Sequence, residues 1–202
     1  MKRVVLLALA MALPMGAFAS SQIVFSNTGG KLTGFSSKGL TLKGSTLTTV
    51  NGLNNGGIIT GNNLGTVSFS TGALLSGSIK LGGVFLGGGS FTITGNGSNG
   101  VPSGVLFAGT FSGPVTWQLL TSPSPRGNIH SYVLTGTLVS TNGGTTGATT
   151  QLTWDTGTRY FDGRARLASG STTTVVPEPG TLSLLGTGLV GLAAVVRRRL
   201  KA

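Results

Sequence analysis

The chain has 202 residues, with 36 glycines, no cysteine and only 8% charged residues. Glycine, serine and threonine form helices poorly, and a chain without cysteine has no disulfide, no thiolate metal ligand and no thiol nucleophile. Six of the 14 basic residues lie at the two ends, so the middle carries eight basic residues against two acidic ones. Because these eight basic residues are scattered along the middle of the sequence, they do not indicate the dense Lys/Arg patch of a nucleic-acid-binding protein.

The first residues have the order of parts that a secretory signal peptide requires. Two basic residues follow Met1, an unbroken apolar run covers residues 4–12, and a small-residue cleavage pattern ends at Ala19. We therefore predict a signal peptide over residues 1–19, handled by the Sec machinery and signal peptidase. An N-terminal membrane helix is the alternative, but the run is short and no stop-transfer charges follow it. The cleavage-site residues are Ala17, Ala19 and Ser20.

Residues 20–174 have the composition and periodicity of a β-rich extracellular domain. Phe91 and Ile93 alternate with threonines, and the same period of two recurs further on. Pairs such as Asn51-Gly52, Gly82-Gly83 and Asn96-Gly97 are typical of hairpin turns. We predict about ten to twelve strands in an all-β fold, an antiparallel β-sandwich or barrel-like domain. The later alternating positions are Val115, Trp117, Leu119, Tyr132, Leu134, Leu138, Leu152 and Trp154.

The first half of this region is less regular. Residues 31–50 repeat a loose Leu-Thr/Ser-Gly pattern, which keeps a β-solenoid open as an alternative. The stretch from Asn51 to Gly65 is rich in asparagine and glycine and is predicted to be a loop. Large aromatic residues concentrate after Ser90, so the best-packed core is expected between Ser90 and Leu167.

Few residues in the region offer catalytic chemistry. His130 is the only histidine and no Gly-x-Ser-x-Gly pattern marks a nucleophile, so we interpret it as a surface or strand-end residue. Asp155 and Asp162 would have to approach each other to act as a glycosidase pair. Neighbouring arginines favour a neutralised surface turn instead. We therefore predict no catalytic residue and a protein that is not an enzyme. The arginines are Arg159, Arg164 and Arg166.

Other kinds of site are disfavoured as well. Two carboxylates cannot supply a calcium site, and one histidine without cysteine cannot supply a zinc site. No glycine-rich loop precedes a helix, so neither a metal nor a nucleotide cofactor is expected. Four aromatic side chains would stack on sugars if they shared an exposed face, but the alternation favours burial of the tryptophans. These are Trp117, Tyr132, Trp154 and Tyr160.

The end of the chain has the features of a membrane anchor. An apolar run without a charged residue covers 181–196 and would form a helix about 24 Å long, against a hydrocarbon core of roughly 30 Å. Three arginines follow, and such basic residues stay on the cytoplasmic side. We predict a C-terminal transmembrane helix with the β domain outside the cell. The orienting residues are Arg197, Arg198 and Arg199.

A proline pair precedes this run: Pro177 and Pro179 flank Glu178 and hold the segment extended. A Pro-Glu-Pro motif, a glycine-containing apolar segment and a terminal arginine cluster, in this order, resemble the PEP-CTERM sorting signal over residues 175–202. The resemblance implies that an exosortase, a membrane transpeptidase, recognises Pro177, Glu178 and Pro179 in a Gram-negative-type bacterium that makes extracellular polysaccharide. A plain anchor is the alternative, but it needs no prolines around a lone acid.

The body is similar to those of acidobacterial PEP-CTERM proteins in the stretches from Gly89 to Gly95 and from Phe111 to Trp117. This likeness implies no known activity. We predict an exported, non-catalytic surface or extracellular-matrix protein that passes through an inner-membrane intermediate and associates with extracellular polysaccharide or biofilm. A secreted glycan-binding module is the alternative, and a secreted hydrolase ranks third. The expected partners are the secretion machinery, an exosortase and the membrane, but not nucleic acid.

Overall fold

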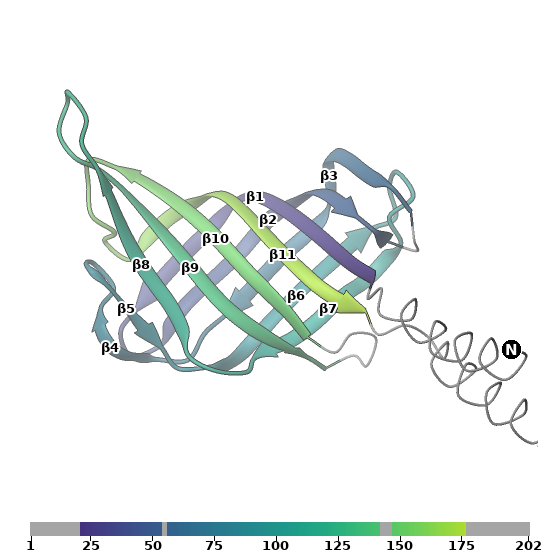
Figure 1. The fold of residues 1–202 in the computed structure, drawn as a ribbon, viewed down its shortest axis with the longest axis horizontal. Helices are drawn as coiled ribbons and strands as arrows, with labels where there is room; N and C mark the ends of the chain where they lie inside the picture. Colours follow the sequence, from purple (N-terminus) through teal and green to yellow (C-terminus); the bar gives the residue numbers. More distant parts are fainter. Residues whose placement is uncertain (1–20, 54–55, 142–146, 177–202) are drawn as a thin grey trace, which may run out of the picture. The chain divides into compact units, whose positions relative to one another are not determined.

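The structure, a computed structural model, describes residues 21–53, 56–141 and 147–176 (Figure 1). Residues Gln22–Val176 form one compact unit, which we call the β unit. No helix within the described ranges is long and apolar enough to cross a membrane. The predictions for both chain ends lie outside the described residues. These are the cleavage site (Ala17, Ala19, Ser20), the motif Pro177, Glu178 and Pro179, the segment 181–196 and the cluster Arg197, Arg198 and Arg199.

The described residues are organised as strands, as the threonine- and glycine-rich composition predicts. Eleven strands are present, within the predicted range. They are β1 (Ser21–Phe35), β2 (Gly39–Asn51), β3 (Ile58–Ser70), β4 (Leu74–Ser78), β5 (Gly82–Phe85), β6 (Gly88–Asn96), β7 (Ser103–Phe111), β8 (Val115–Ser122), β9 (Ile129–Ser140), β10 (Gly147–Gly157) and β11 (Arg164–Val176).

All strands belong to one antiparallel sheet, in the order β10-β11-β1-β2-β3-β6-β7-β9-β8-β5-β4. Strand β10 also pairs with β9, so the sheet closes on itself and the front strands cross over the back ones (Figure 1). The all-β prediction is confirmed, and the closed sheet matches its barrel-like form rather than the sandwich. Closure leaves most strands paired on both sides, which removes exposed edges.

Strand β9 is the point where the sheet branches. Its residues Ile129–Thr135 pair with β8, whereas Leu138–Ser140 pair with β7 along the same side. Strand β8 continues through β5 to β4, so these three strands extend from the closed ring. The turn between β4 and β5 is tied back to the core, because Trp117 Nε1 donates to the carbonyl oxygen of Ile79 at 2.9 Å.

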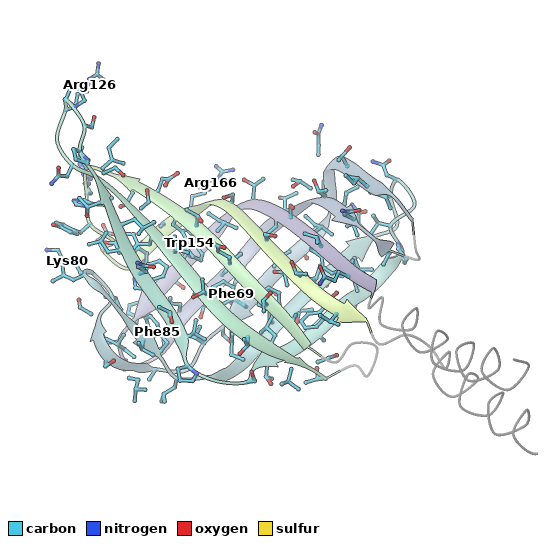
Figure 2. The ribbon with its side chains drawn as sticks, viewed as in Figure 1. Phe69, Lys80, Phe85, Arg126, Trp154 and Arg166 are labelled. Atoms are coloured by element: carbon cyan, nitrogen blue, oxygen red, sulfur yellow. The ribbon has the colours of Figure 1, made fainter. Side chains whose placement is uncertain are left out.

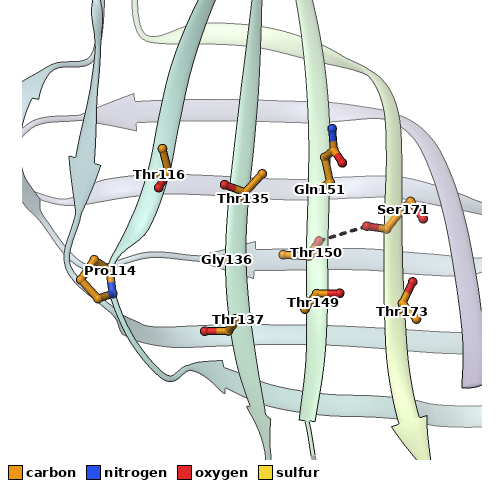
Figure 3. Close-up of a pocket in the computed structure, with 10 residues that line it drawn as sticks. All are labelled: Pro114, Thr116, Thr135, Gly136, Thr137, Thr149, Thr150, Gln151, Ser171 and Thr173. Atoms are coloured by element: carbon orange, nitrogen blue, oxygen red, sulfur yellow. Dashed lines mark hydrogen bonds between the residues drawn. The ribbon is translucent and has the colours of Figure 1, made fainter.

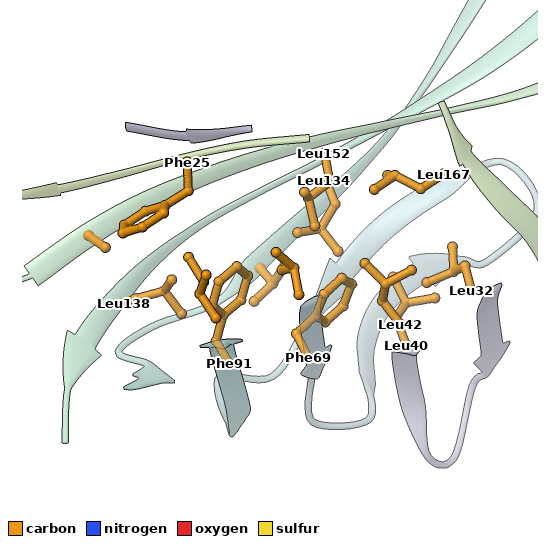
Figure 4. Packing of buried hydrophobic residues seen from close by; sticks show 14 of the residues in the cluster. Phe25, Leu32, Leu40, Leu42, Phe69, Phe91, Leu134, Leu138, Leu152 and Leu167 are labelled. Carbon is orange, nitrogen blue, oxygen red and sulfur yellow. The ribbon is translucent and has the colours of Figure 1, made fainter. Parts of the chain in front are cut away.

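The core fills the inside of the closed sheet. Figure 2 places Phe69 and Trp154 between the strands, and Figure 4 shows side chains from opposite strands meeting there. The predicted period of two is confirmed for Phe91 and Ile93, both fully buried. Core residues come from the whole unit: Phe25, Leu32, Leu40, Leu42, Leu47, Val50, Leu64, Val67, Phe69, Phe85, Phe91, Ile93, Val101, Phe107, Phe111, Val115, Trp117, Tyr132, Leu134, Leu138, Ala148, Leu152, Trp154, Phe161 and Leu167.

The first half differs from the sequence-based expectations in three respects. Core residues also come from outside Ser90–Leu167, where the best-packed core was expected, because a closed sheet turns the inner face of every strand toward the same interior. The solenoid alternative is excluded by the antiparallel β1–β2 hairpin, in which Lys31 pairs with Lys43. Most of the predicted Asn51–Gly65 loop is strand, since β3 begins at Ile58.

The predicted turns have mixed outcomes. Asn51-Gly52 and Asn96-Gly97 connect β2 to β3 and β6 to β7, and both glycines have positive φ, +85° and +83°. These two turn predictions are confirmed. Gly82-Gly83 instead begins β5, directly after the turn at residues 79–81.

Candidate functional site

The outer face of β8 to β11 carries hydroxyl groups in rows. Strand residues alternate between the two faces of a sheet, and the inward positions here are taken by core residues. The register sets Thr116, Thr135, Gln151 and Ser171 next to one another across four strands. These side chains line an open groove of about 450 Å³ (Figure 3). The full lining is Pro114, Thr116, Thr135, Gly136, Thr137, Thr149, Thr150, Gln151, Ser171 and Thr173.

A second groove continues the first onto β1 and β2, and the two share Gln151 and Ser171. We call their outward polar side chains together the hydroxyl face. Adjacent strands are roughly 4.8 Å apart, so the face offers closely spaced donors and acceptors without charge. Its members are Ser26, Thr28, Thr48, Thr116, Thr135, Thr137, Thr149, Gln151, Thr153, Ser169, Ser171 and Thr173.

Much of this hydrogen-bonding capacity is unused inside the β unit. Thr28 Oγ1 donates to the carbonyl oxygen of Ala168 at 2.9 Å, and Thr48 Oγ1 to that of Ser26 at 3.2 Å. Thr137 Oγ1 lies 2.9 Å from Ser112 Oγ. Within the described residues, the other nine side chains of the face form no hydrogen bond, which leaves their polar groups for solvent or a ligand. These are Ser26, Thr116, Thr135, Thr149, Gln151, Thr153, Ser169, Ser171 and Thr173.

His130 lies at the start of β9, as predicted, but it is buried rather than on the surface. The ring of Tyr160 stacks on it, with the ring centroids 4.1 Å apart and 20° between the planes. Its Nδ1 lies 3.2 Å from Thr121 Oγ1. No carboxylate forms a hydrogen bond or ion pair with the imidazole within the described ranges, so the hydrogen bonds of a hydroxyl–histidine–acid triad are not formed.

The two aspartates lie on the surface, and their carboxylates accept hydrogen bonds from different donors. Ser131 Oγ donates to Asp155 Oδ1 at 2.7 Å, and the backbone N–H of Arg164 donates to Asp162 Oδ1 at 3.3 Å. Neither forms an ion pair with a nearby arginine in the described part of the chain, so the neutralised turn is not formed as predicted.

The tryptophans are buried, as the alternation predicted. Trp117 stacks on Tyr132 with the centroids 4.8 Å apart, and Trp154 is also fully enclosed. Tyr160 is 40% exposed, and Lys80 Nζ lies 5.1 Å from its ring centroid. The two tryptophans therefore offer no platform on which a sugar ring stacks.

Comparison with known families adds the decisive observation. The family model described as the PEP-CTERM protein-sorting motif matches residues 175–199. The chain therefore carries a PEP-CTERM protein-sorting motif. The match covers the predicted motif Pro177, Glu178 and Pro179 and the three arginines, and it indicates an exported protein that an exosortase sorts. No curated protein and no solved structure matches the chain.

The hydroxyl face on the β unit was not predicted from the sequence. Alternating hydroxyl residues are visible in the sequence, for example Thr149, Gln151 and Thr153, or Ser169, Ser171 and Thr173. What the sequence does not show is that β9, β10 and β11 align these short runs into rows.

Proposed function

We propose that this exosortase-sorted protein is a non-catalytic component of the cell surface or extracellular matrix that associates with polysaccharide. It would pass through an inner-membrane intermediate, as its tail predicts. The hydroxyl face carries this proposal. A polysaccharide presents hydroxyls that both donate and accept hydrogen bonds, and the threonine, serine and glutamine side chains complement them.

The absence of charge on the hydroxyl face favours a binding or architectural role over a hydrolytic one. Glycoside hydrolysis needs a pair of carboxylic groups close to the scissile bond. The lining of the two grooves contains none. Several weak contacts repeated along a polymer give retention through multivalency, which suits a matrix component.

Sorting is tested by changing the motif. Replacing Pro177, Glu178 and Pro179 together by alanine removes the extended, acidic recognition segment, so we expect the tail to stay attached. Mass spectrometry of protein from the native host should show an N-terminus at Ser20 in both forms. The unchanged protein should end near Pro179, and the variant should keep Arg197, Arg198 and Arg199. If the unchanged protein and the variant end at the same C-terminal residue, the motif does not direct processing of the tail.

Polysaccharide association is tested on the hydroxyl face. We expect Thr135→Val with Thr149→Val to weaken binding to the host's extracellular polysaccharide, measured by co-sedimentation, by about fivefold or more, since each lost hydrogen bond contributes roughly 0.5–1.5 kcal/mol. Valine keeps the shape and the strand preference of threonine. The matched control is Thr66→Val with Thr94→Val, which pair across β3 and β6 outside both grooves. Equal losses in the two double variants would refute the role of the face.

A further inference from the structure

Four of the eight basic residues between Ser20 and Thr174 gather on one part of the outer surface. Lys31 on β1 and Lys43 on β2 are direct register partners, and Arg164 and Arg166 follow on β11, the other neighbour of β1. All four side chains are exposed and line a common shallow groove with Gly30 and Ala165. We call these four residues the cationic patch.

Two hydrogen bonds, one on either side of the patch, join β1 to β11 and the residue before it. Gly34 N–H donates to Gly163 O at 2.9 Å, and the Thr28 hydroxyl donates to Ala168 O at 2.9 Å, which fixes β11 against β1. Between these contacts, Gly29 has φ +70°. A Cβ there would lie 3.5 Å from Arg166 Nη2, an ordinary van der Waals distance, so the guanidinium of Arg166 lies close to the backbone of β1. Figure 2 shows Arg166 pointing away from the sheet.

Within the described residues, no ion pair neutralises the cationic patch. Asp155 and Asp162 are the two carboxylates there; Asp162 Oδ1 accepts the backbone N–H of Arg164 at 3.3 Å, but neither carboxylate forms an ion pair with a patch side chain. Like charges directly opposite each other on a sheet, as in Lys31 and Lys43, are destabilising. A bound anion would relieve this repulsion, and exposed cations attract anions over roughly 8–10 Å at moderate salt.

We propose that the cationic patch binds the carboxylates of an acidic polysaccharide, an inference that rests on the polysaccharide association proposed above. The patch is continuous with the hydroxyl face: Thr28 precedes Lys31 on β1, and Ser169 follows Arg166 on β11. A uronate-containing chain that crosses this surface meets cations for its carboxylates and then hydroxyls for its neutral groups. Charge and hydrogen-bonding complementarity therefore point to one ligand class.

The surroundings of the patch fit nucleic acid and membranes less well. Channels for single-stranded nucleic acid stack successive bases on several aromatic rings. Here Phe35, 57% exposed, is the exposed aromatic on the same outward side of β1 as Lys31. Membrane-surface binding combines cations with a broad apolar face. The groove lining between the four cations is only Gly30 and Ala165.

The experiment measures binding of the full-length purified protein to polygalacturonate, to its methyl ester, in which the carboxylates are neutralised, and to neutral dextran. We expect the protein to bind polygalacturonate more tightly than its ester. We also expect the affinity for polygalacturonate to fall as the salt concentration is raised. Lys31→Gln, Lys43→Gln and Arg166→Gln together should weaken polygalacturonate binding by about tenfold or more. The control with the same loss of charge is Lys80→Gln, Arg126→Gln and Arg159→Gln, which should bind almost as well as the unchanged protein.

Each other outcome counts against the proposal. Equal binding of polygalacturonate and its ester, or equal losses in the two triple variants, overturns the patch while leaving polysaccharide association in place. Tighter binding to duplex DNA or to phosphatidylglycerol vesicles than to polygalacturonate also overturns it. Failure of the host's own polysaccharide to bind at all removes the proposed function instead. The comparison of ester and acid uses the unchanged chain, so it does not depend on how a variant folds.

Discussion

Trp117→Ala is expected to lower the free energy of unfolding of the β unit by about 3–5 kcal/mol. Trp117 is 1% exposed, and its ring packs against Tyr132, Trp154 and Phe161, with centroids 4.8, 5.3 and 5.4 Å away. Truncation leaves a large cavity where these rings meet. It also leaves the carbonyl oxygen of Ile79 without its indole donor. Both effects act in the same direction.

Urea unfolding of the purified chain provides the measurement. The protein has two tryptophans, so Trp154 remains as the fluorescent reporter in the variant. Leu120→Ala is the control, because Leu120 is on the same strand but 43% exposed. We expect it to change stability by less than about 1 kcal/mol. If the two variants lose stability equally, the tryptophan cluster does not anchor the core.

The parts of the fold that the sequence predicted are those with local causes. Alternation along β6, β8 and β10 identified the inward residues correctly, because a strand places every second side chain on one face. Asn-Gly pairs marked two hairpin turns, because only a few residues tolerate positive φ. The sorting motif is also contiguous in the chain, and the family match confirms it.

The parts that escaped prediction depend on distant pairing. In the stretch read as a loop, Gly65 is a strand residue with φ +152°, and a Cβ there would collide with the carbonyl oxygen of Thr94. Composition alone cannot separate such a glycine from a turn glycine. The cationic patch was missed for a related reason: Lys31 and Arg166 are far apart in the sequence, and only the pairing of β1 with β11 brings them together.

Tyr132→Phe is the second substitution with a large expected effect, about 1–3 kcal/mol of lost stability. The buried Tyr132 hydroxyl donates to the carbonyl oxygen of Lys80 at 2.6 Å and accepts the backbone N–H of Phe161 at 2.9 Å. It thus ties the β4–β5 turn to the segment before β11. Phenylalanine fills nearly the same volume, so the lost free energy of unfolding comes from the two unpaired backbone groups rather than from a cavity. Ser112→Ala, which removes an exposed hydroxyl bonded to Thr137, is the control and should cost less.

The same hydroxyl makes stability depend on alkaline pH. Burial raises the pKa of Tyr132 above its ordinary value of 10.0, and the N–H of Phe161 offsets this rise only in part. Above about pH 10 the unfolded chain therefore releases this proton while the folded chain retains it, so stability falls as pH rises through the folded pKa. Tyr132→Phe lacks this ionisation. We expect the stability difference between the two proteins to be constant near neutral pH and to narrow above about pH 10 in urea titrations. A stability difference that stays constant there would show that the phenol ionises equally readily in the folded unit and the unfolded chain, and a difference that widens would show that it ionises more readily in the folded unit.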